Sequence, residues 1–358
     1  MKRAAILAVL VSAVLAGTPL PAKAPLHVDD DGAQWPGAYL DIETALADAV
    51  VGDTILVHEG VYPGAINVLT DRVALRADGS AVLDADSFPP PPWGDAGIVL
   101  RAGVSGVTIQ GLEIRSFGAG IVVVDDAHDN VVKSNTVSGS AGVGIVLGMA
   151  TANSIVGNEV IRSGFGIVVA EDCHDNVVKS NTVSDSASVG IVVDTATANS
   201  IVGNEVTRSG AGGLVLVNAS AGNEVVGNVV TASGGNGITL TNLATNNVVK
   251  DNQVTASGLI HWQWKDGIRI AGDENEIKDN DVSDSREDGI GIRGDRNLVA
   301  DNRVLSSGRY GISMLYSITN DNMARDNSVS GSLVFDLCDD GLGIGNVWRD
   351  NRYDTSNF

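Results

Sequence analysis

The 358-residue sequence predicts an all-β fold: a right-handed parallel β-helix of about a dozen coils with a short N-terminal capping helix. A repeat is the first observation, because the string N-x-V-x-x-N-x-V recurs with some variation from mid-chain to the end, as in 130–137 and 153–160. Composition is the second, since Val, Gly and Asn recur while aromatic residues make up only 4%, which is typical of short strands between tight turns. No 3.6-residue apolar pattern accompanies the repeat, so a helical solenoid is disfavoured.

Each repeat corresponds to one coil of three short strands and three turns, and successive coils should stack about 4.8 Å apart. The second Asn of the string stands at positions 135, 158, 181, 204, 228, 252, 280, 302, 327 and 351. Asn tolerates the left-handed backbone conformation of a sharp turn, and stacked Asn amides can hydrogen-bond along the axis. One interior column is predicted to contain Ile121, Ile145, Ile167, Ile191, Ile238, Ile268, Ile290 and Ile312.

The front of the chain differs from the repeats. Residues 1–24 read as a secretory signal peptide, with a basic start, an apolar run over 4–16 that is too short to span a bilayer, and an A-x-A-like cleavage site at 22–24. Residues 25–96 should form the N-terminal cap and first coils, and residues 97–358 the repeat coils. Within the cap, 41–50 predicts the amphipathic helix that covers the first coil.

Charge and hydropathy limit the partners. The 23 basic and 44 acidic residues give a net charge of −21, which argues against a nucleic-acid partner. No stretch after the signal is long and apolar enough for a membrane span. We therefore expect a secreted or periplasmic protein, and its oligomeric state stays open.

A resemblance adds to this prediction. The string IETALADAVVGDTILVHEGVY (42–62) resembles the opening of the pectin-lyase-like superfamily of β-helices. The Asn-rich coils resemble those of the periplasmic family linked to nitrous-oxide-reductase maturation and of extracellular polysaccharide lyases and epimerases. The resemblance implies a protein acting on an extracellular, uronic-acid-containing polysaccharide as a lyase, epimerase or hydrolase. The alternative is a non-catalytic β-helix that binds a glycan or a protein, or that assists copper delivery.

Enzymes of this superfamily usually bind substrate along one sheet face, so we compared two columns of the strand that begins with Gly-Ile. The second residue after the Gly is Val122, Val146, Val168, Val192, Val215, Thr239, Arg269, Gly291 and Ser313 in successive coils. The residue before that Gly is Ala119, Val143, Phe165, Val189, Gly212, Asn236, Asp266, Asp288 and Tyr310. Both columns become mostly polar near residue 236. Strict alternation would put the second column on the interior side with the Ile residues, so we assume that the turn ends at the Gly and breaks the alternation there. The C-terminal half therefore carries the candidate site.

Five residues are the candidate catalytic groups: Asp266, Asp288, Arg269, Lys265 and Tyr310. The two aspartates should lie about 5 Å apart at the backbone, so one is protonated, or a cation or an Arg lies between them. In a hydrolase they would be the acid and its partner carboxylate. In a lyase or epimerase Lys265, Arg269 or Tyr310 would remove the proton beside a uronate carboxylate, and the aspartates would hold Ca²⁺, the one cofactor expected. Asp288→Asn should then abolish turnover without lowering thermal stability.

The candidate substrate-binding residues surround this pair. They are Trp262, Trp264, His261, Asn236, Thr239 and Arg293. Exposed Trp rings suit stacking on sugar faces. The alternative interpretation is a set of solvated charges in mutual salt bridges, with both Trp rings packed under their own loop.

Other patterns favour structural roles. D-x-H-D at 126–129 and 172–175 resembles the acid–His motif of mannuronan epimerases, but 123–167 and 169–213 share long identical strings at an offset of 46, so a copied turn is favoured. An Asp column before the second Asn, at 251, 279, 301, 326 and 350, indicates surface electrostatics. Cys173 and Cys338 should lie about 33 Å apart, too far for a disulfide.

Overall fold

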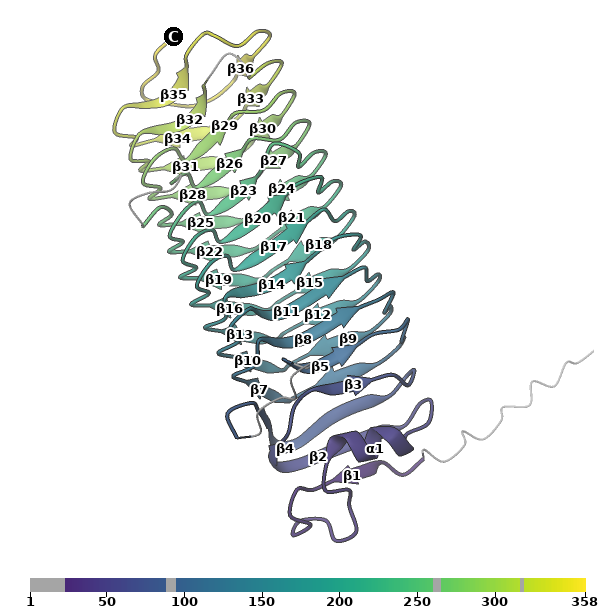
Figure 1. Ribbon diagram of the computed structural model, residues 1–358. Coiled ribbons are helices and arrows are strands. Elements are labelled where there is room, and N and C mark those ends of the chain that lie inside the picture. The colour runs from purple at the N-terminus through teal and green to yellow at the C-terminus, as the bar shows by residue number, and fades with distance from the viewer. Residues whose placement is uncertain (1–22, 88–94, 260–264, 316–318) are drawn as a thin grey trace, which may run out of the picture.

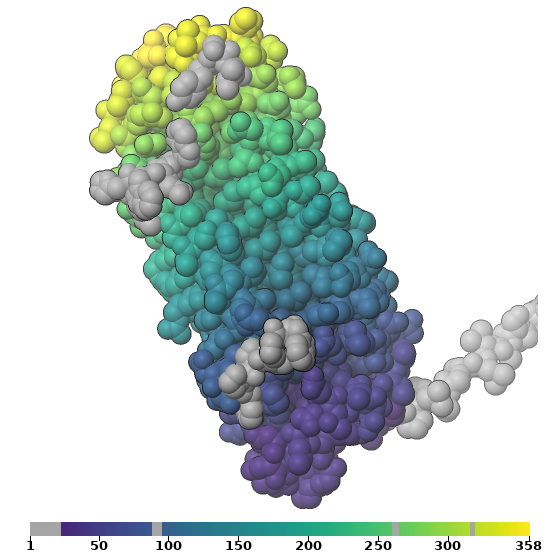
Figure 2. Space-filling model, in the orientation of Figure 1, coloured from purple at the N-terminus to yellow at the C-terminus, as the bar shows by residue number. Residues whose placement is uncertain are grey.

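The computed structural model describes residues 23–87, 95–259, 265–315 and 319–358, and this part of the chain forms a rod-shaped parallel β-helix (Figures 1 and 2). Its secondary structure comprises one short helix, α1 (Ile42–Asp48), and β-strands that pair in parallel from coil to coil. The prediction of an all-β solenoid with an N-terminal helix is confirmed. No helix in the described part is long and apolar enough to cross a membrane.

One wall of the rod is a 12-stranded parallel sheet, which we name sheet B. In order it contains β3 (Ile66–Val68), β5 (Ala96–Leu100), β8 (Ala119–Val124), β11 (Val143–Gly148), β14 (Phe165–Val169), β17 (Ile191–Asp194), β20 (Leu214–Val217), β23 (Ile238–Leu240), β26 (Ile268–Ile270), β29 (Ile290–Ile292), β32 (Tyr310–Met314) and β35 (Phe335–Asp339).

The other two walls belong to a 24-stranded sheet, which we name sheet A. Its first ladder is β6 (Thr108–Gln110), β9 (Val131–Lys133), β12 (Ser154–Val156), β15 (Val177–Lys179), β18 (Ser200–Val202), β21 (Glu224–Val226), β24 (Val248–Lys250), β27 (Glu276–Lys278), β30 (Leu298–Ala300), β33 (Met323–Arg325) and β36 (Val347–Arg349). Its second ladder is β7 (Glu113–Arg115), β10 (Thr136–Ser138), β13 (Glu159–Ile161), β16 (Thr182–Ser184), β19 (Glu205–Thr207), β22 (Val229–Thr231), β25 (Gln253–Thr255), β28 (Asp281–Ser283), β31 (Arg303–Leu305) and β34 (Ser328–Ser330). The long strand β4 (Ala74–Asp84) joins the two ladders, because it pairs with β6 and with β7.

The N-terminal end is closed by α1 and by β1 (Leu26–Val28), which pairs with β2 (Thr54–Tyr62). The helix begins where the Asp41 side chain accepts the backbone N–H of Thr44, a typical N-cap. Its apolar face, Ile42, Ala45 and Leu46, is buried in the core. The predicted cap is thus confirmed.

The Ile of each Gly-Ile segment lies in the core. The predicted Ile column is fully buried, whereas Phe165, one residue before its Gly, is 38% exposed. The alternation therefore breaks at the glycine, as assumed. This position requires glycine because a Cβ on Gly267 would collide with Val282 of the same coil.

Asn side chains build two continuous ladders inside the turns. In one link, Nδ2 of Asn181 donates to Oδ1 of Asn204 at 3.0 Å and also to the backbone oxygen of Ile155 at 2.9 Å. The predicted amide stacking is confirmed. The prediction that these Asn residues adopt the left-handed conformation is wrong, because positive φ falls on the preceding residue, such as Ser180 at 53° or Asp279 at 56°. The preceding residue makes the left-handed turn, and the Asn amide satisfies backbone and side-chain groups within it.

The C-terminal end has no helix over it within the described residues. Its last coil exposes Leu342, Ile344 and Phe358. The two cysteines, Cys173 and Cys338, are buried and unlinked, as predicted.

Candidate functional site

The column formed by the second residue after the Gly is a ladder on sheet B. Register pairs Val215 with Thr239, Thr239 with Arg269, Arg269 with Gly291, and Gly291 with Ser313. These side chains belong to the outer face, since the Ile residues on either side of Arg269 are fully buried. The change from apolar to polar residues is therefore a change along one surface.

Asp266 and Asp288 lie on this outer face yet are fully buried. The backbone N–H of Asp288 donates to Oδ1 of Asp266 at 3.2 Å. A Cβ on Gly291 would stand 2.9 Å from Oδ2 of Asp266 and 3.5 Å from Oδ2 of Asp288. The missing side chain at Gly291 is thus what leaves room for both carboxylates.

Asp288 is held by hydrogen bonds from two neighbours on the next coil. Arg309 donates from Nε to Oδ1 at 2.7 Å and from Nη2 to Oδ2 at 2.6 Å, and the Ser313 hydroxyl donates to Oδ2 at 2.6 Å. This bidentate ion pair raises the pKa of Arg309 further above its usual range.

Asp266 is approached by two other arginines. Nη1 of Arg269 and Nη2 of Arg293 each lie 3.6 Å from its Oδ2, and Nη2 of Arg293 lies 3.8 Å from Oδ2 of Asp288. Burial, followed by repulsion from Asp288, raises the pKa of Asp266 to about 6. The cluster holds three guanidinium groups against two carboxylates.

This burial corrects the role assigned to the aspartate pair. In the hydrolase alternative the two aspartates would be the acid and its partner carboxylate, but neither reaches solvent, because Gly291 leaves room for them beneath the arginines. Of the alternatives left open, arginine lies at the pair, and Asp266 is the carboxyl that burial drives toward protonation.

The donor set does not fit Ca²⁺, which takes six to eight oxygen ligands. Three guanidinium groups already approach the pair, so a dication there would face like charge. Among the described residues, metal-ligand spacing occurs instead at Asp29, Asp30 and Asp31. There Asp29 and Asp30 accept backbone N–H groups of Trp35 and Val61, so they shape a loop.

The other predicted residues differ in their surroundings. Asn236 is buried under the pair, where its Oδ1 accepts the N–H of Asp266 and its Nδ2 donates to Thr239. Tyr310 stacks on Phe335 beneath the Arg309 guanidinium, and burial raises its pKa, so it is a poor base at neutral pH. Half-buried Lys265 precedes Asp266. His261, Trp262 and Trp264 lie outside the described residues.

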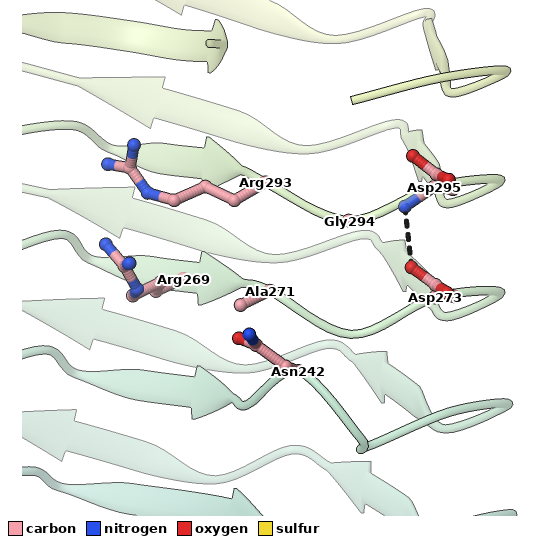
Figure 3. Close-up of a pocket in the computed structure, with 7 residues that line it drawn as sticks. All are labelled: Asn242, Arg269, Ala271, Asp273, Arg293, Gly294 and Asp295. Carbon is pink, nitrogen blue, oxygen red and sulfur yellow. Dashed lines mark hydrogen bonds between the residues drawn. The ribbon is translucent and has the colours of Figure 1, made fainter. Parts of the chain in front are cut away.

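A pocket of ≈ 390 Å³ opens beside the arginines (Figure 3). It is lined by Asn242, Arg269, Ala271, Asp273, Arg293, Gly294 and Asp295. The structure therefore brings Arg269 and Arg293 together at an accessible surface, although Arg293 itself is only 7% exposed.

The two D-x-H-D segments form turns far from this pocket along the chain. His128 and His174 each bond the following aspartate, Asp129 and Asp175, at 2.8 Å. Both aspartates have positive φ, 55° and 58°. Bridges place the two His residues two coils apart, with Thr151 between them, which agrees with the copied-turn interpretation.

Four site residues were not singled out by the sequence: Arg309 and Gly291 at the aspartate pair, and Asp273 and Asp295 in the pocket. Arg309 follows Lys265 and Glu287 in the column beside the aspartates. Extending the column comparison by one position would have found it. Gly291 was noticed only as a member of the polar column, because a missing side chain gives no chemical signal.

The fold and this charged face define a β-helix with one polar cluster on sheet B. The chain belongs to the family described as right handed beta helix region, whose model matches residues 96–254 and 259–354. This match confirms the predicted handedness and the resemblance.

Solved structures share the fold at low identity. The A-module of the Azotobacter vinelandii mannuronan C-5 epimerase AlgE4 is 14% identical, with a TM-score of 0.59 over 87% of this chain and 93% of its own. PfbA, a surface adhesin of Streptococcus pneumoniae, is 12% identical, with a TM-score of 0.67 over 88% and 92%. The periplasmic alginate epimerase AlgG is 14% identical, with a TM-score of 0.51 over 84% and 77%. No curated protein matches the sequence.

Proposed function

We propose that this protein binds a uronic-acid-containing polysaccharide on the outer face of sheet B, with Arg269 and Arg293 holding a uronate carboxylate. The observation that carries the proposal is the local excess of arginine. Three guanidinium groups meet two carboxylates beside an open pocket, in a protein of net charge −21. Guanidinium forks suit planar carboxylates.

Two further observations support a glycan ligand. Two of the similar structures are epimerases of alginate or mannuronan, and a third is a surface adhesin. The proposal also places the protein in the periplasm or outside the cell, in line with the signal expected over 1–24.

Binding is favoured over hydrolysis by the burial of Asp266 and Asp288, which cannot reach a glycosidic oxygen without displacing their arginines. A lyase or epimerase activity is the second candidate. Arginines on a uronate carboxylate would stabilise the charge that develops when the adjacent proton leaves. Ultraviolet absorbance of unsaturated uronates and NMR of C-5 inversion across a uronate panel test this candidate.

The binding test compares the double variant Arg269→Gln/Arg293→Gln with Arg208→Gln/Arg303→Gln. The control removes the same charge from exposed ion pairs with Asp185 and Asp281. Calorimetry with alginate oligosaccharides should show at least about tenfold weaker binding for the first variant only.

A third variant covers the case in which the double variant fails to fold. Ala271→Glu puts a negative charge into the pocket and keeps every arginine and aspartate of the cluster, and it should also weaken binding. Unchanged affinity in a folded Ala271→Glu protein, or equal losses in test and control pairs, would overturn the proposal.

A further inference from the structure

The pocket beside the arginines has two ends of opposite charge. Figure 3 shows the guanidinium groups of Arg269 and Arg293 at one end and the carboxylates of Asp273 and Asp295 at the other. Uncharged Ala271 lies between them. A ligand that fills the ≈ 390 Å³ pocket therefore meets both signs.

We propose that the pocket accepts a dipolar saccharide segment, in which a uronate binds Arg269 and Arg293 while a free amino group on the adjoining sugar binds Asp273 and Asp295. The inference rests on the proposed function for its uronate half. It adds the chemical class of the neighbouring sugar.

The aspartates retain the capacity to accept such a group. Asp273 uses Oδ1 to accept the N–H of Asp295 at 2.8 Å, and Asp295 uses Oδ1 to accept from Asn320 at 2.7 and 3.3 Å. Within the described part of the chain, Oδ2 of Asp295 has no hydrogen bond. Arg296 lies 4.0 Å from Oδ2 of Asp273, but its Nε already donates to Glu274 at 2.8 Å. An ammonium group would add charge-assisted hydrogen bonds at this end.

Charge disfavours the other sugars. A second uronate in the segment would place its carboxylate against Asp273 and Asp295. A polymer of uronates alone should therefore bind more weakly than a segment with both charges, since the net charge of −21 also opposes it. A neutral sugar would form no ion pair with Asp273 or Asp295. A segment with one carboxylate and one ammonium group carries no net charge and matches both ends.

The test measures calorimetric affinity for two probes: a hexasaccharide of alternating glucuronate and N-acetylglucosamine, and the same hexasaccharide after N-deacetylation. The deacetylated form should bind at least about tenfold more tightly. Asp273→Asn/Asp295→Asn should remove this preference, because Asn keeps the Oδ1 acceptor and loses the charge.

The matched control is Asp279→Asn/Asp301→Asn on sheet A. These aspartates also belong to turns on successive coils and have positive φ, 56° and 58°, which Asn tolerates. The control should keep the preference, which rules out general attraction of amines to an acidic protein.

Each outcome decides between the two proposals. If the probes bind equally through Arg269 and Arg293, or if the preference survives in Asp273→Asn/Asp295→Asn, the dipolar ligand is rejected and uronate binding stands. If neither probe nor alginate oligosaccharides bind, both proposals fail.

Discussion

The N-terminal and C-terminal halves of sheet B share one backbone architecture but present different outer faces. From β8 to β20 the outward column is Val122, Val146, Val168, Val192 and Val215. From β23 to β32, the same column supplies Thr239, Arg269, Gly291 and Ser313. The Asn ladders run through both halves without interruption.

The comparison shows that the residues that hold the coils together differ from the residues that one face presents to a ligand. Interior positions are nearly constant because every coil must fit the coil before and after it. Outer positions are free to vary, and in the C-terminal half they collect charge.

The largest effect is expected from Asn204→Ala in the apolar half. Oδ1 of Asn204 accepts two hydrogen bonds from Asn181, and its Nδ2 donates to the backbone oxygen of Val178 and to Asn228. Losing four buried hydrogen bonds should lower the free energy of unfolding by about 4 kcal/mol, measured by chemical denaturation. Thr207→Ala on the outer side of β19 is the control and should cost under about 0.5 kcal/mol. A small loss for Asn204→Ala would contradict the ladder's role.

Asp288→Asn should come next, with a loss of roughly 3 kcal/mol in unfolding free energy, because it breaks a buried bidentate ion pair with Arg309. This reverses the expectation drawn from the sequence, that the change would spare thermal stability. A melting temperature equal to that of the unaltered protein would show that the charged cluster contributes nothing to the fold.

The smallest expected effect is a pH dependence of the unfolding free energy, which arises from Asp266 in the C-terminal half. Because the pKa of Asp266 is raised to about 6 from 3.8, the unfolded chain releases this proton first as pH rises. The group's contribution to stability is complete below about pH 4 and is lost as pH rises through 6, by roughly 3 kcal/mol in total.

Asp266→Asn has no such titration. Unfolding free energies measured from pH 4 to 8 should therefore show the unaltered protein falling relative to Asp266→Asn. Parallel curves for the two proteins would exclude the raised pKa.

Most of the fold could be predicted from the sequence because it is periodic. Placing residues one period apart on top of each other gave the Ile column and the Asn amide ladder, and it brought Asp266 next to Asp288. The left-handed turn residue was assigned one position too late. The repeat shows that an Asn occurs at each turn. Only the backbone shows that the residue before the Asn, and not the Asn itself, has the left-handed conformation.

The burial of Asp266 and Asp288 could not be predicted from the repeat. Alignment of the repeats places Asp266 and Asp288 on one surface but does not show whether water reaches them. That depends on Gly291, which leaves a gap, and on Arg269, Arg293 and Arg309, whose long side chains fold over it.

The sequence by itself determined the solenoid, the order of its coils and the half of sheet B that carries charge, because all three follow from periodicity along the chain. Only the tertiary structure decided that the aspartates are buried, that arginines neutralise them, and that the accessible surface is a pocket with opposite charges at its ends. The physical reason is that burial and charge balance depend on side chains from several coils at once, and no single repeat contains them.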